Sequence, residues 1–290
     1  MQLGVTEEAT RRTAAFVSER KQFGVLISSF GAIKHKLAEQ VIRLYASESA
    51  VYRVSRDIND LMDRYKSEPC DNGRAAIDAI SHYAVEAAIL KVAGSEMLDM
   101  VVDEAVQIHG GMGYSAEVDV ERAYRDSRIN RIFEGTNEIN RLLVGDTAMK
   151  RAMKGDFDLF GEAEKLFNGI DNLTDGRTDS ESYYQEIKRY LGNFKKLILI
   201  CIHGSMKNFA KGLISEQEVM NNIANMMMEI YLSESMALRI EKLETLRGEV
   251  ALYRDILNVN IRETANLVRK EATDAICSFS SGESVPSLVR

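Results

Sequence analysis

Hydrophobic residues recur at helical spacing along almost the whole chain, and no segment of useful length alternates with the period of a strand. A first helix is predicted at about residues 6–19, with Thr6 as its N-cap and acidic residues in its first turn. The pattern breaks near Gln22-Phe23-Gly24. A much longer helix is then predicted from Ser28 or Ser29, with an apolar stripe that continues to Tyr65. The pattern favours an all-α protein.

The next turn is predicted at Pro69 and Asp71-Asn72-Gly73. A second long apolar stripe follows from Ile77 to Ile108 and stops at Gly110-Gly111. Two long helices that are joined by a short turn must lie antiparallel, so we expect an antiparallel four-helix bundle. A shorter helix at about 118–128 and another that carries Ile139 to Met149 complete a first domain at residues 1–155.

The composition changes beyond residue 155. Residues 168–180 are polar and rich in turn-forming residues, and they are the best linker candidate in the chain. Three further helical patterns follow near 182–211, 216–246 and 249–278, which predicts a second, smaller helical domain at residues 156–290. Met226-Met227-Met228 is interpreted as core filler. The tail from Ser280 is expected to fray.

Composition and charge narrow the function classes. The chain has 290 residues, of which 45% are hydrophobic and 28% charged, and its net charge of -7 argues against a nucleic-acid partner. We expect no membrane span and no secretory signal. Three widely spaced cysteines (Cys70, Cys201, Cys277) indicate free thiols in a reducing compartment, so we predict a cytoplasmic protein. The four histidines have no metal-ligand spacing, and no metal site is predicted.

Glu134 is the first candidate for chemistry. It lies in a turn, with Phe133 as a hydrophobic neighbour and Gly135 as a point of close backbone approach. Desolvation beside an aromatic ring would raise the pKa of this carboxyl towards the range that suits a general base. Thr136 and Asn137 add a hydroxyl, an amide and the N–H groups of a helix start. The alternative is an ordinary solvated loop glutamate.

Two other segments could hold a bulky ligand. Gln107 to Gly113, which begins Gln107-Ile108-His109-Gly110-Gly111, is a glycine-rich turn, but it ends a helix and lacks the spacing of a dinucleotide-binding loop, so a simple helix C-cap is the alternative. Arg20-Lys21-Gln22-Phe23-Gly24 combines a cation, an amide and an aromatic ring, which suits a pyrophosphate and a planar ring. It equally suits a surface ion pair with a core-anchoring phenylalanine.

Taken in order, these segments form a specific signature. Arg20–Gly24, Gln107–Gly111 and Ile132–Ile139 together resemble the C-terminal helical domain of the acyl-CoA dehydrogenases, over about residues 3–150. The helical extension beyond about residue 156 is similar in architecture to that of the very-long-chain acyl-CoA dehydrogenase branch.

The resemblance implies α,β-dehydrogenation of an acyl-CoA thioester with FAD as hydride acceptor. It makes Glu134 the base that removes the α-proton and places Gly135 against the thioester. Electrons would pass to an electron-transfer flavoprotein. Thr136, Asn137 and Glu138 match residues that touch the chain's own FAD. The residues that match contacts to a neighbouring subunit's FAD, and so imply at least a homodimer, are Arg20, Gln22, Phe23, Gln107, Ile108, His109, Gly110 and Gly111.

The sequence departs from the family pattern in two ways. Gly31 stands where many members carry a glutamine, so one cofactor hydrogen bond is not expected. The family's N-terminal helical domain and middle β-domain do not precede residue 1, which predicts a C-terminal fragment with half a site. For the extension, the acidic balance favours a packing or dimer-supporting role over peripheral membrane contact.

Two other functions remain open from the sequence. A non-catalytic helical assembly module derived from the family would be colourless and take up no FAD in a full-length preparation. A related flavoenzyme could act on a non-CoA substrate, such as a nitroalkane or an acyl-carrier-protein thioester. Substrate profiling of the intact protein with its flavin content would separate these possibilities.

Overall fold

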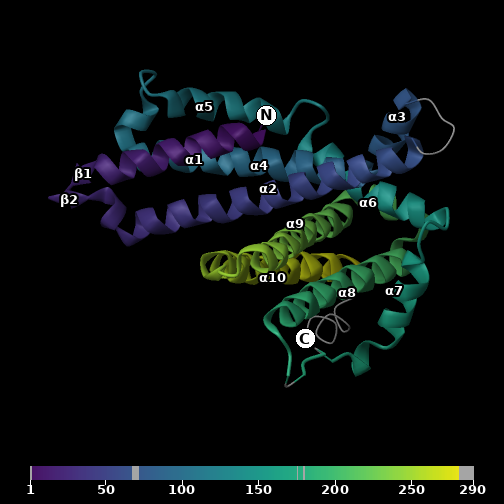
Figure 1. Ribbon diagram of the computed structural model, residues 1–290. Helices are drawn as coiled ribbons and strands as arrows, with labels where there is room; N and C mark the ends of the chain where they lie inside the picture. The colour runs from purple at the N-terminus through teal and green to yellow at the C-terminus, as the bar shows by residue number, and fades with distance from the viewer. Residues whose placement is uncertain (1, 67–71, 175, 179, 281–290) are drawn as a thin grey trace.

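A computed structural model describes residues 2–66, 72–174, 176–178 and 180–280. These residues form ten α-helices and one short antiparallel strand pair, so the predicted all-α class is confirmed. The strands are β1 (Lys21–Gln22) and β2 (Val25–Leu26), which close a hairpin at one end of the molecule (Figure 1). Short 3₁₀ segments connect the helices at η1 (Ile27–Ser29), η2 (Gly110–Tyr114), η3 (Arg128–Arg131), η4 (Ile170–Asn172) and η5 (Ala210–Ser215).

The first half of the chain packs around helix α4 (Ala84–His109), which contacts α1 (Gln2–Glu19), α2 (Gly31–Lys66) and α6 (Asn137–Met153). Helix α5 (Asp119–Ser127) lies across α4 on the side of α1 (Figure 1). Residues along α4 such as Val92, Val101 and Val102 are fully buried, because this helix has neighbours on all sides. The helix therefore carries apolar residues around most of its circumference.

Three predicted helix boundaries were wrong. Helix α1 begins at Gln2, so Thr6 is an interior residue; its hydroxyl donates to the carbonyl oxygen of Gln2 at 2.9 Å. Helix α2 begins at Gly31, because Phe30 is extended after η1. Asn72 and Gly73, predicted as a turn, start helix α3 (Asn72–His82). The rest of that predicted turn, Pro69 and Asp71, lies outside the described residues, as do Cys70 and the tail from residue 281.

The predicted continuous helix from Ile77 to Ile108 is also interrupted. Tyr83 leaves the helical conformation, with φ -97° and ψ 28°, and its N–H bonds to the carbonyl of Ile80 at 3.2 Å. Helix α4 restarts at the next residue and runs for 26 residues to His109, where Gly110 ends it as the sequence predicted.

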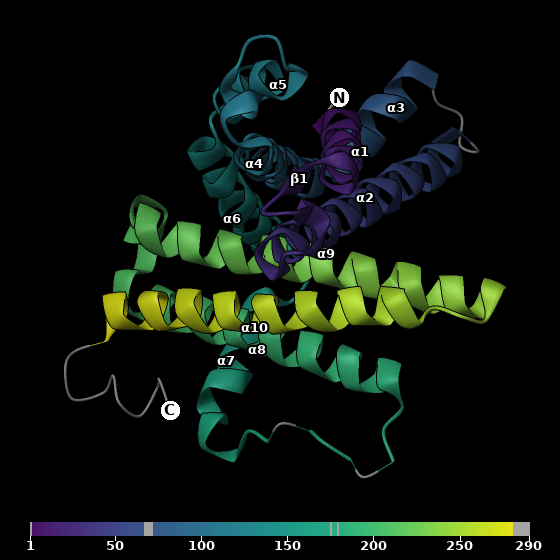
Figure 2. The same cartoon turned by 90° about the vertical axis from the view of Figure 1, so that its left-hand side faces the viewer.

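The second half contains α7 (Leu159–Asn168), α8 (Tyr183–Phe209), α9 (Gln217–Arg247) and α10 (Ala251–Phe279). Helix α7 was not predicted, although Asp158 caps it by accepting a hydrogen bond from the N–H of Gly161 at 2.9 Å. Helices α8, α9 and α10 pack on one another and lie under the first bundle in two perpendicular views (Figures 1 and 2). Met226 is fully buried, as predicted.

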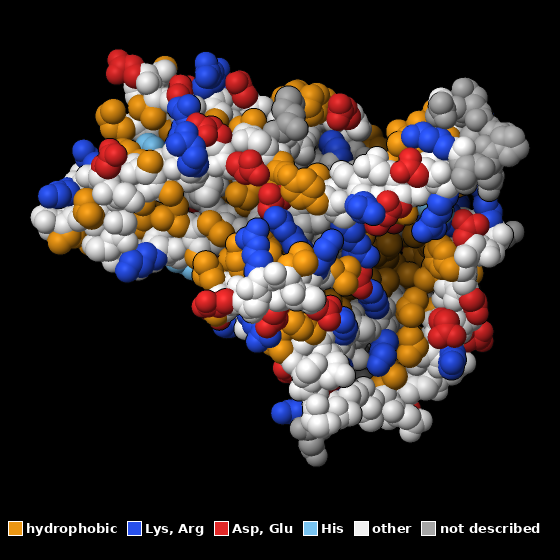
Figure 3. All heavy atoms as spheres, viewed as in Figure 1, with side chains coloured by type: hydrophobic (Ala, Val, Ile, Leu, Met, Phe, Trp, Pro, Cys, Tyr) orange, Lys and Arg blue, Asp and Glu red, His pale blue; other side chains and the backbone are white. Residues whose placement is uncertain are grey.

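One hydrophobic core joins the two halves. Ala46 and Ala50 from α2 and Met149 from α6 share a cluster with buried residues of α8, α9 and α10. Helices α6 and α9 approach closely at Gly145, where an added Cβ would lie 2.6 Å from the Met220 side chain. Beside this contact lies a hydrophobic hollow of about 320 Å³ between α6 and α8, visible in Figure 3. The division at residues 155 and 156 stays a prediction.

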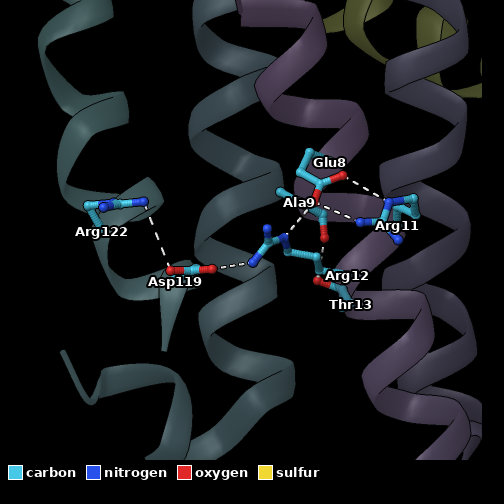
Figure 4. A network of polar contacts seen from close by, with 7 residues as sticks. All are labelled: Glu8, Ala9, Arg11, Arg12, Thr13, Asp119 and Arg122. Atoms are coloured by element: carbon cyan, nitrogen blue, oxygen red, sulfur yellow. Dashed lines mark hydrogen bonds and ion pairs between the residues drawn. The ribbon is translucent and has the colours of Figure 1, made fainter. Parts of the chain in front are cut away.

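An ion pair joins α5 to α1 on the outer surface. Arg12 of α1 bonds both to Glu8 within its own helix, at 2.6 Å, and to Asp119 at the start of α5 (Figure 4). Arg11 also donates to Glu8, at 2.8 Å. Both arginines lower the pKa of the Glu8 carboxyl to about 2, the hydrogen bond from Arg11 being the larger cause.

Candidate active site

The Glu134 turn has a rare backbone conformation. Glu134 has φ 57° and Gly135 has φ 81°, so two consecutive residues are left-handed. This region costs a residue with a side chain roughly 1–2 kcal/mol, and such strain persists only where neighbouring groups enforce it. Strain of this kind is concentrated at functional sites. Glu134 is exposed, which leaves its carboxylate available to a ligand.

Asn140 holds the turn from inside helix α6. Its side-chain Nδ2 lies near three consecutive carbonyl oxygens and donates to those of Gly135, at 2.9 Å, and Thr136, at 3.0 Å, with a longer contact of 3.4 Å to Glu134. A Cβ on Gly135 would lie only 3.1 Å from this nitrogen. Glycine is favoured at residue 135 by its φ value, and a side chain there would also crowd the Asn140 amide.

Lys91 of α4 fixes the same turn from below. Its Nζ donates to the carbonyl oxygen of Gly135 at 2.6 Å and to Oδ1 of Asn137 at 2.8 Å. Burial lowers the pKa of Lys91, and the nearby carboxylates of Glu134 and Glu138 act in the opposite direction. Lys91 thus places a positive charge beneath Glu134 and holds the turn against α4.

The start of α6 follows the turn directly. The Thr136 hydroxyl caps the helix by accepting from the N–H of Ile139 at 3.4 Å. The Asn137 side chain is buried against α4, where Nδ2 donates to Ser95 and Glu96, each at 3.0 Å. Asn137 can therefore reach a ligand only through its main chain. Glu138 is exposed, and hydrogen bonds from its own N–H and from Thr136 lower its pKa.

The surroundings of Glu134 are hydrophobic but open. Ile129, Ile132, Phe133 and Ile139 all expose at least a third of their surface beside the turn. The enclosure that the sequence suggested for the Glu134 carboxylate is therefore not supplied by the described residues. An exposed apolar rim around a single carboxylate suits a site that is completed by a bound ligand or by another domain.

The Arg20–Gly24 segment forms the β1–β2 hairpin. Phe23 is left-handed at φ 52° and 91% exposed at the tip, where its ring and that of Phe30 form a T-shaped pair with centroids 6.3 Å apart. The alternative of a core-anchoring Phe23 is thus wrong. Arg20 and Gln22 are exposed beside it. Gly31 is also exposed at the start of α2, with open space where a side chain would begin.

The Gln107–Gly111 segment ends α4 next to that hairpin. Gln107, Gly110 and Gly111 are exposed, whereas Ile108 is only 5% exposed and packs with Val17 and Ile27. His109 stacks on Phe16 at 4.0 Å and its Nδ1 lies 2.7 Å from the carbonyl of Ala105. Ile108 and His109 therefore shape this end of the bundle, and the exposed residues beside them are free for a ligand.

The two regions lie far apart on one molecule. Lys91 contacts the Glu134 turn, and Gln107 is 16 residues further along the same helix, which is a separation of roughly 24 Å at 1.5 Å per residue. Figure 1 shows the hairpin at the far end of α1 and α2. One small ligand cannot contact both regions of one chain. That they serve different sites stays a prediction.

Sequence reasoning missed the residues that hold this site in place. Lys91, Asn140 and Ser95 contact the turn or its first helical residue, but none lies in a recognisable motif. Gly113 was predicted as part of the glycine-rich turn, and the structure adds a packing reason for it, since an added Cβ there would lie 2.5 Å from the carbonyl oxygen of Val106. The only available signal was indirect, since Asn140 and Lys91 stand on the helices predicted to flank the turn.

The described residues contain no group of three or more metal-ligating side chains. None of their helices is both long and hydrophobic enough to cross a membrane. Cys201 is buried, which raises the pKa of its thiol to about 12, and Cys277 is exposed; both are free.

Several known proteins that resemble this chain are described as acyl-CoA dehydrogenases. The family profile described as acyl-CoA dehydrogenase, C-terminal domain, matches residues 1–149, and a second profile of the same description matches residues 193–288. A probable acyl-CoA dehydrogenase of Bacillus subtilis is 37% identical over 285 residues, which are 98% of this chain and 48% of that protein. The human mitochondrial very long-chain specific acyl-CoA dehydrogenase is 33% identical over 232 residues, 74% of this chain and 32% of that protein.

A solved structure matches throughout. The crystal structure of an acyl-CoA dehydrogenase complexed with FAD from Bacillus anthracis superimposes with a TM-score of 0.92 at 35% identity, covering 100% of this chain and 50% of that one. The chain therefore spans about half the length of its Bacillus relatives.

Proposed function

Because the chain belongs to the acyl-CoA dehydrogenase family, we propose that it is the C-terminal part of an FAD-dependent enzyme that oxidises fatty acyl-CoA thioesters in β-oxidation. The observation that carries this proposal is the strained Glu134–Gly135 turn at the start of α6. It presents an exposed carboxylate and is fixed by Asn140 and Lys91. A scaffold that only packs against other chains has no need of a strained, exposed carboxylate.

The reaction is a removal of H⁺ and H⁻ from neighbouring carbons. Glu134 takes the α-proton of the thioester on its carboxylate, and the C–H electrons form the α,β double bond as the β-hydrogen leaves with its electron pair. FAD, when bound, supplies the acceptor for that hydride. Hydrogen bonds from its own N–H and from Thr136 lower the pKa of Glu138, which makes it a weaker base than an ordinary glutamate.

The Glu134 turn can also stabilise the charge that develops on the thioester oxygen. Among the described residues, the main-chain N–H groups of Glu134 and Gly135 make no hydrogen bond within the chain. A preorganised N–H that points at a developing oxyanion is an effective catalytic group. We assign the Glu134 N–H to the thioester oxygen and place Gly135, which has no side chain, against the thioester.

The residues for FAD fit in two separate regions. The start of α6 offers the main-chain N–H groups of Thr136 and Asn137 at a helix N-terminus, with the exposed side chain of Glu138 beside them, which suits a polar part of the chain's own cofactor. At the other end, Phe23 and Gly110 project from the surface, with Arg20, Gln22, Gln107 and Gly111 exposed around them. We assign this end to the FAD of a second subunit, with Ile108 and His109 contributing main chain and support.

Two partners follow from this assignment. A site that is shared between subunits requires at least a homodimer. Each turnover also leaves two electrons that must pass to an acceptor before the next one, and we propose an electron-transfer flavoprotein for that role.

The assignment is tested by Glu134→Gln in the full-length protein. The measurement is loss of oxidised-flavin absorbance after anaerobic addition of a fatty acyl-CoA, with Glu117→Gln as a matched control on an exposed loop glutamate. We expect Glu134→Gln to slow flavin reduction at least a hundredfold, a typical contribution of a general base, and Glu117→Gln to leave it unchanged. Equal rates for both variants would refute the assignment of the base.

A further inference from the structure

The polar contacts beneath the Glu134 turn do not end at α4. Asn137 donates through Nδ2 to Oε1 of Glu96 at 3.0 Å, and the other oxygen of Glu96 accepts from Nη2 of Arg141 at 2.8 Å. Arg141 stands one turn after Asn137 on α6, and its side chain is only 17% exposed. Glu96 therefore ties the first residue of α6 to a nearly buried guanidinium.

Arg141 carries the contacts into the C-terminal helices. Its Nε donates to Oδ1 of Asn225 on α9 at 2.7 Å. The Nδ2 of Asn225 in turn donates to Oε2 of Glu271 on α10 at 3.2 Å. Glu271 is 7% exposed, and its second oxygen lies 3.4 Å from Nζ of Lys270. A continuous series of hydrogen bonds thus runs from the carbonyl of Gly135 to α10.

The direction of each bond in this series is fixed by charge. Arg141 can only donate and the ionised Glu271 can only accept, so the amide of Asn225 must point its oxygen at α6 and its nitrogen at α10. The guanidinium group of Arg141 likewise uses both Glu96 and Asn225 as hydrogen-bond acceptors. Loss of Asn225 leaves one donor of Arg141, whose side chain is 17% exposed, and one oxygen of Glu271, which is 7% exposed, without these partners.

We propose that Arg141, Asn225 and Glu271 are positioning residues, through which α9 and α10 hold Lys91 and the Glu134–Gly135 turn in the conformation that catalysis uses. The expected effect on catalysis rests on the proposed function. The expected effect on the conformation of the turn does not rest on it. It gives the C-terminal helices a role in the active site that is separate from assembly. The close approach of α6 and α9 at Gly145 supplies the rigid contact on which the series depends.

A purely structural role would act differently. If Asn225 only helped α9 to dock, its loss would weaken the whole domain, and all amides that open by global unfolding would exchange faster together. If it positions the turn, exchange should rise in residues 132–140 while the core of α4 stays protected. The matched control is Asn222→Leu, because Asn222 also lies on α9 and makes no side-chain hydrogen bond among the described residues.

The experiment compares Asn225→Leu, Asn222→Leu and the conservative Asn225→Gln in the full-length protein. Amide hydrogen exchange is followed in residues 132–140, and kcat and KM are measured with a fatty acyl-CoA. We expect Asn225→Leu to speed exchange of the turn roughly tenfold and to lower kcat by a similar factor with little change in KM, and Asn225→Gln to recover part of both. The control should match the unmodified protein.

Two outcomes would overturn the proposal. One is turn exchange in Asn225→Leu equal to that of Asn222→Leu, and the other is a uniform rise across α4 and α6. The experiment also separates this proposal from the proposed function. If the unmodified full-length protein does not oxidise a fatty acyl-CoA, the proposed function is refuted. If Asn225→Leu still speeds amide exchange in residues 132–140 of that protein, the positioning role of Asn225 stands.

Discussion

Lys91 donates a hydrogen bond of 2.6 Å from Nζ to the carbonyl oxygen of Gly135, which joins the middle of the bundle to the turn that carries Glu134. The same nitrogen bonds to Asn137, so one cation holds both the strained turn and the first residue of α6. Burial lowers the pKa of Lys91, and the nearby carboxylates, including that of Glu134, act in the opposite direction by favouring its charged form.

Replacing Lys91 with methionine should release the turn without leaving a cavity. The expected result is a drop in kcat of roughly tenfold, because the carbonyl of Gly135 and the amide of Asn137 lose their donor, while the cooperativity of unfolding stays intact. Steady-state kinetics of the full-length enzyme and urea unfolding measure the two effects. An unchanged kcat would show that Asn140 alone fixes the turn.

Replacing Asn140 with leucine should affect stability as well. Asn140 is buried and its Nδ2 serves the carbonyls of Gly135 and Thr136, so the substitution should cost about 1–3 kcal/mol in the free energy of unfolding. Urea denaturation measures that cost. Leu143→Asn is a control of opposite polarity on the same helix, at an exposed position, and should change stability by less than about 0.5 kcal/mol. A smaller loss in Asn140→Leu than in the control would contradict the role given to Asn140.

The residues of the Glu134 turn could be predicted from the sequence. The residues that hold the turn in place, Lys91 and Asn140, could not. Glu134, Gly135 and Thr136 stand in one short motif, and the structure places them on one turn and helix start. Lys91 lies 43 residues before Glu134 in the sequence, and only the packing of α4 on α6 brings it beneath the turn. Asn137 and Ile108 matched family positions, but a motif does not reveal that their side chains point into the protein.

The fold shows the same limit. The helical period correctly predicted long helices, because apolar stripes report which face is buried. It could not predict the break at Tyr83. There the main-chain N–H bonds to the carbonyl oxygen of Ile80, three residues earlier, while the apolar stripe continues. Helix α7 was missed because its ten residues follow a glycine- and aspartate-containing stretch that resembled a loop. Contacts such as Arg141 with Asn225 depend on how two distant helices dock.

The hairpin tip offers a test of the second cofactor region. Phe23→Ser should not lower the stability of the folded chain, because the ring is 91% exposed and has one aromatic contact. In the full-length protein, the same substitution should weaken FAD retention, measured as flavin content after gel filtration. Leu246→Ser removes a hydrophobic side chain that is 72% exposed in the last turn of α9 and should leave flavin content unchanged. Equal flavin content in both variants would remove Phe23 from the cofactor site.

Acid should weaken the surface pairs of α1. Arg11 and Arg12 lower the pKa of Glu8 from 4.5 to about 2 in the folded protein. A depressed pKa means that Glu8 stabilises the fold above pH 4.5 and that this contribution is lost as the pH falls through about 2. The contribution is small, because these pairs are exposed to solvent. Urea midpoints of the unmodified protein and Glu8→Gln should differ at pH 6 and converge towards pH 2, and a gap independent of pH would contradict this account.

The most direct measurement of the central claim is exchange of the substrate α-proton with D₂O. The full-length protein, Glu134→Gln and Glu138→Gln are incubated with a saturated acyl-CoA without an electron acceptor, and deuterium incorporation is followed by mass spectrometry. If Glu134 is the base, its variant should lose exchange by at least about a hundredfold, whereas Glu138→Gln should retain most of it. Retained exchange in Glu134→Gln, with loss in Glu138→Gln, would contradict the assignment and move the base to the start of α6.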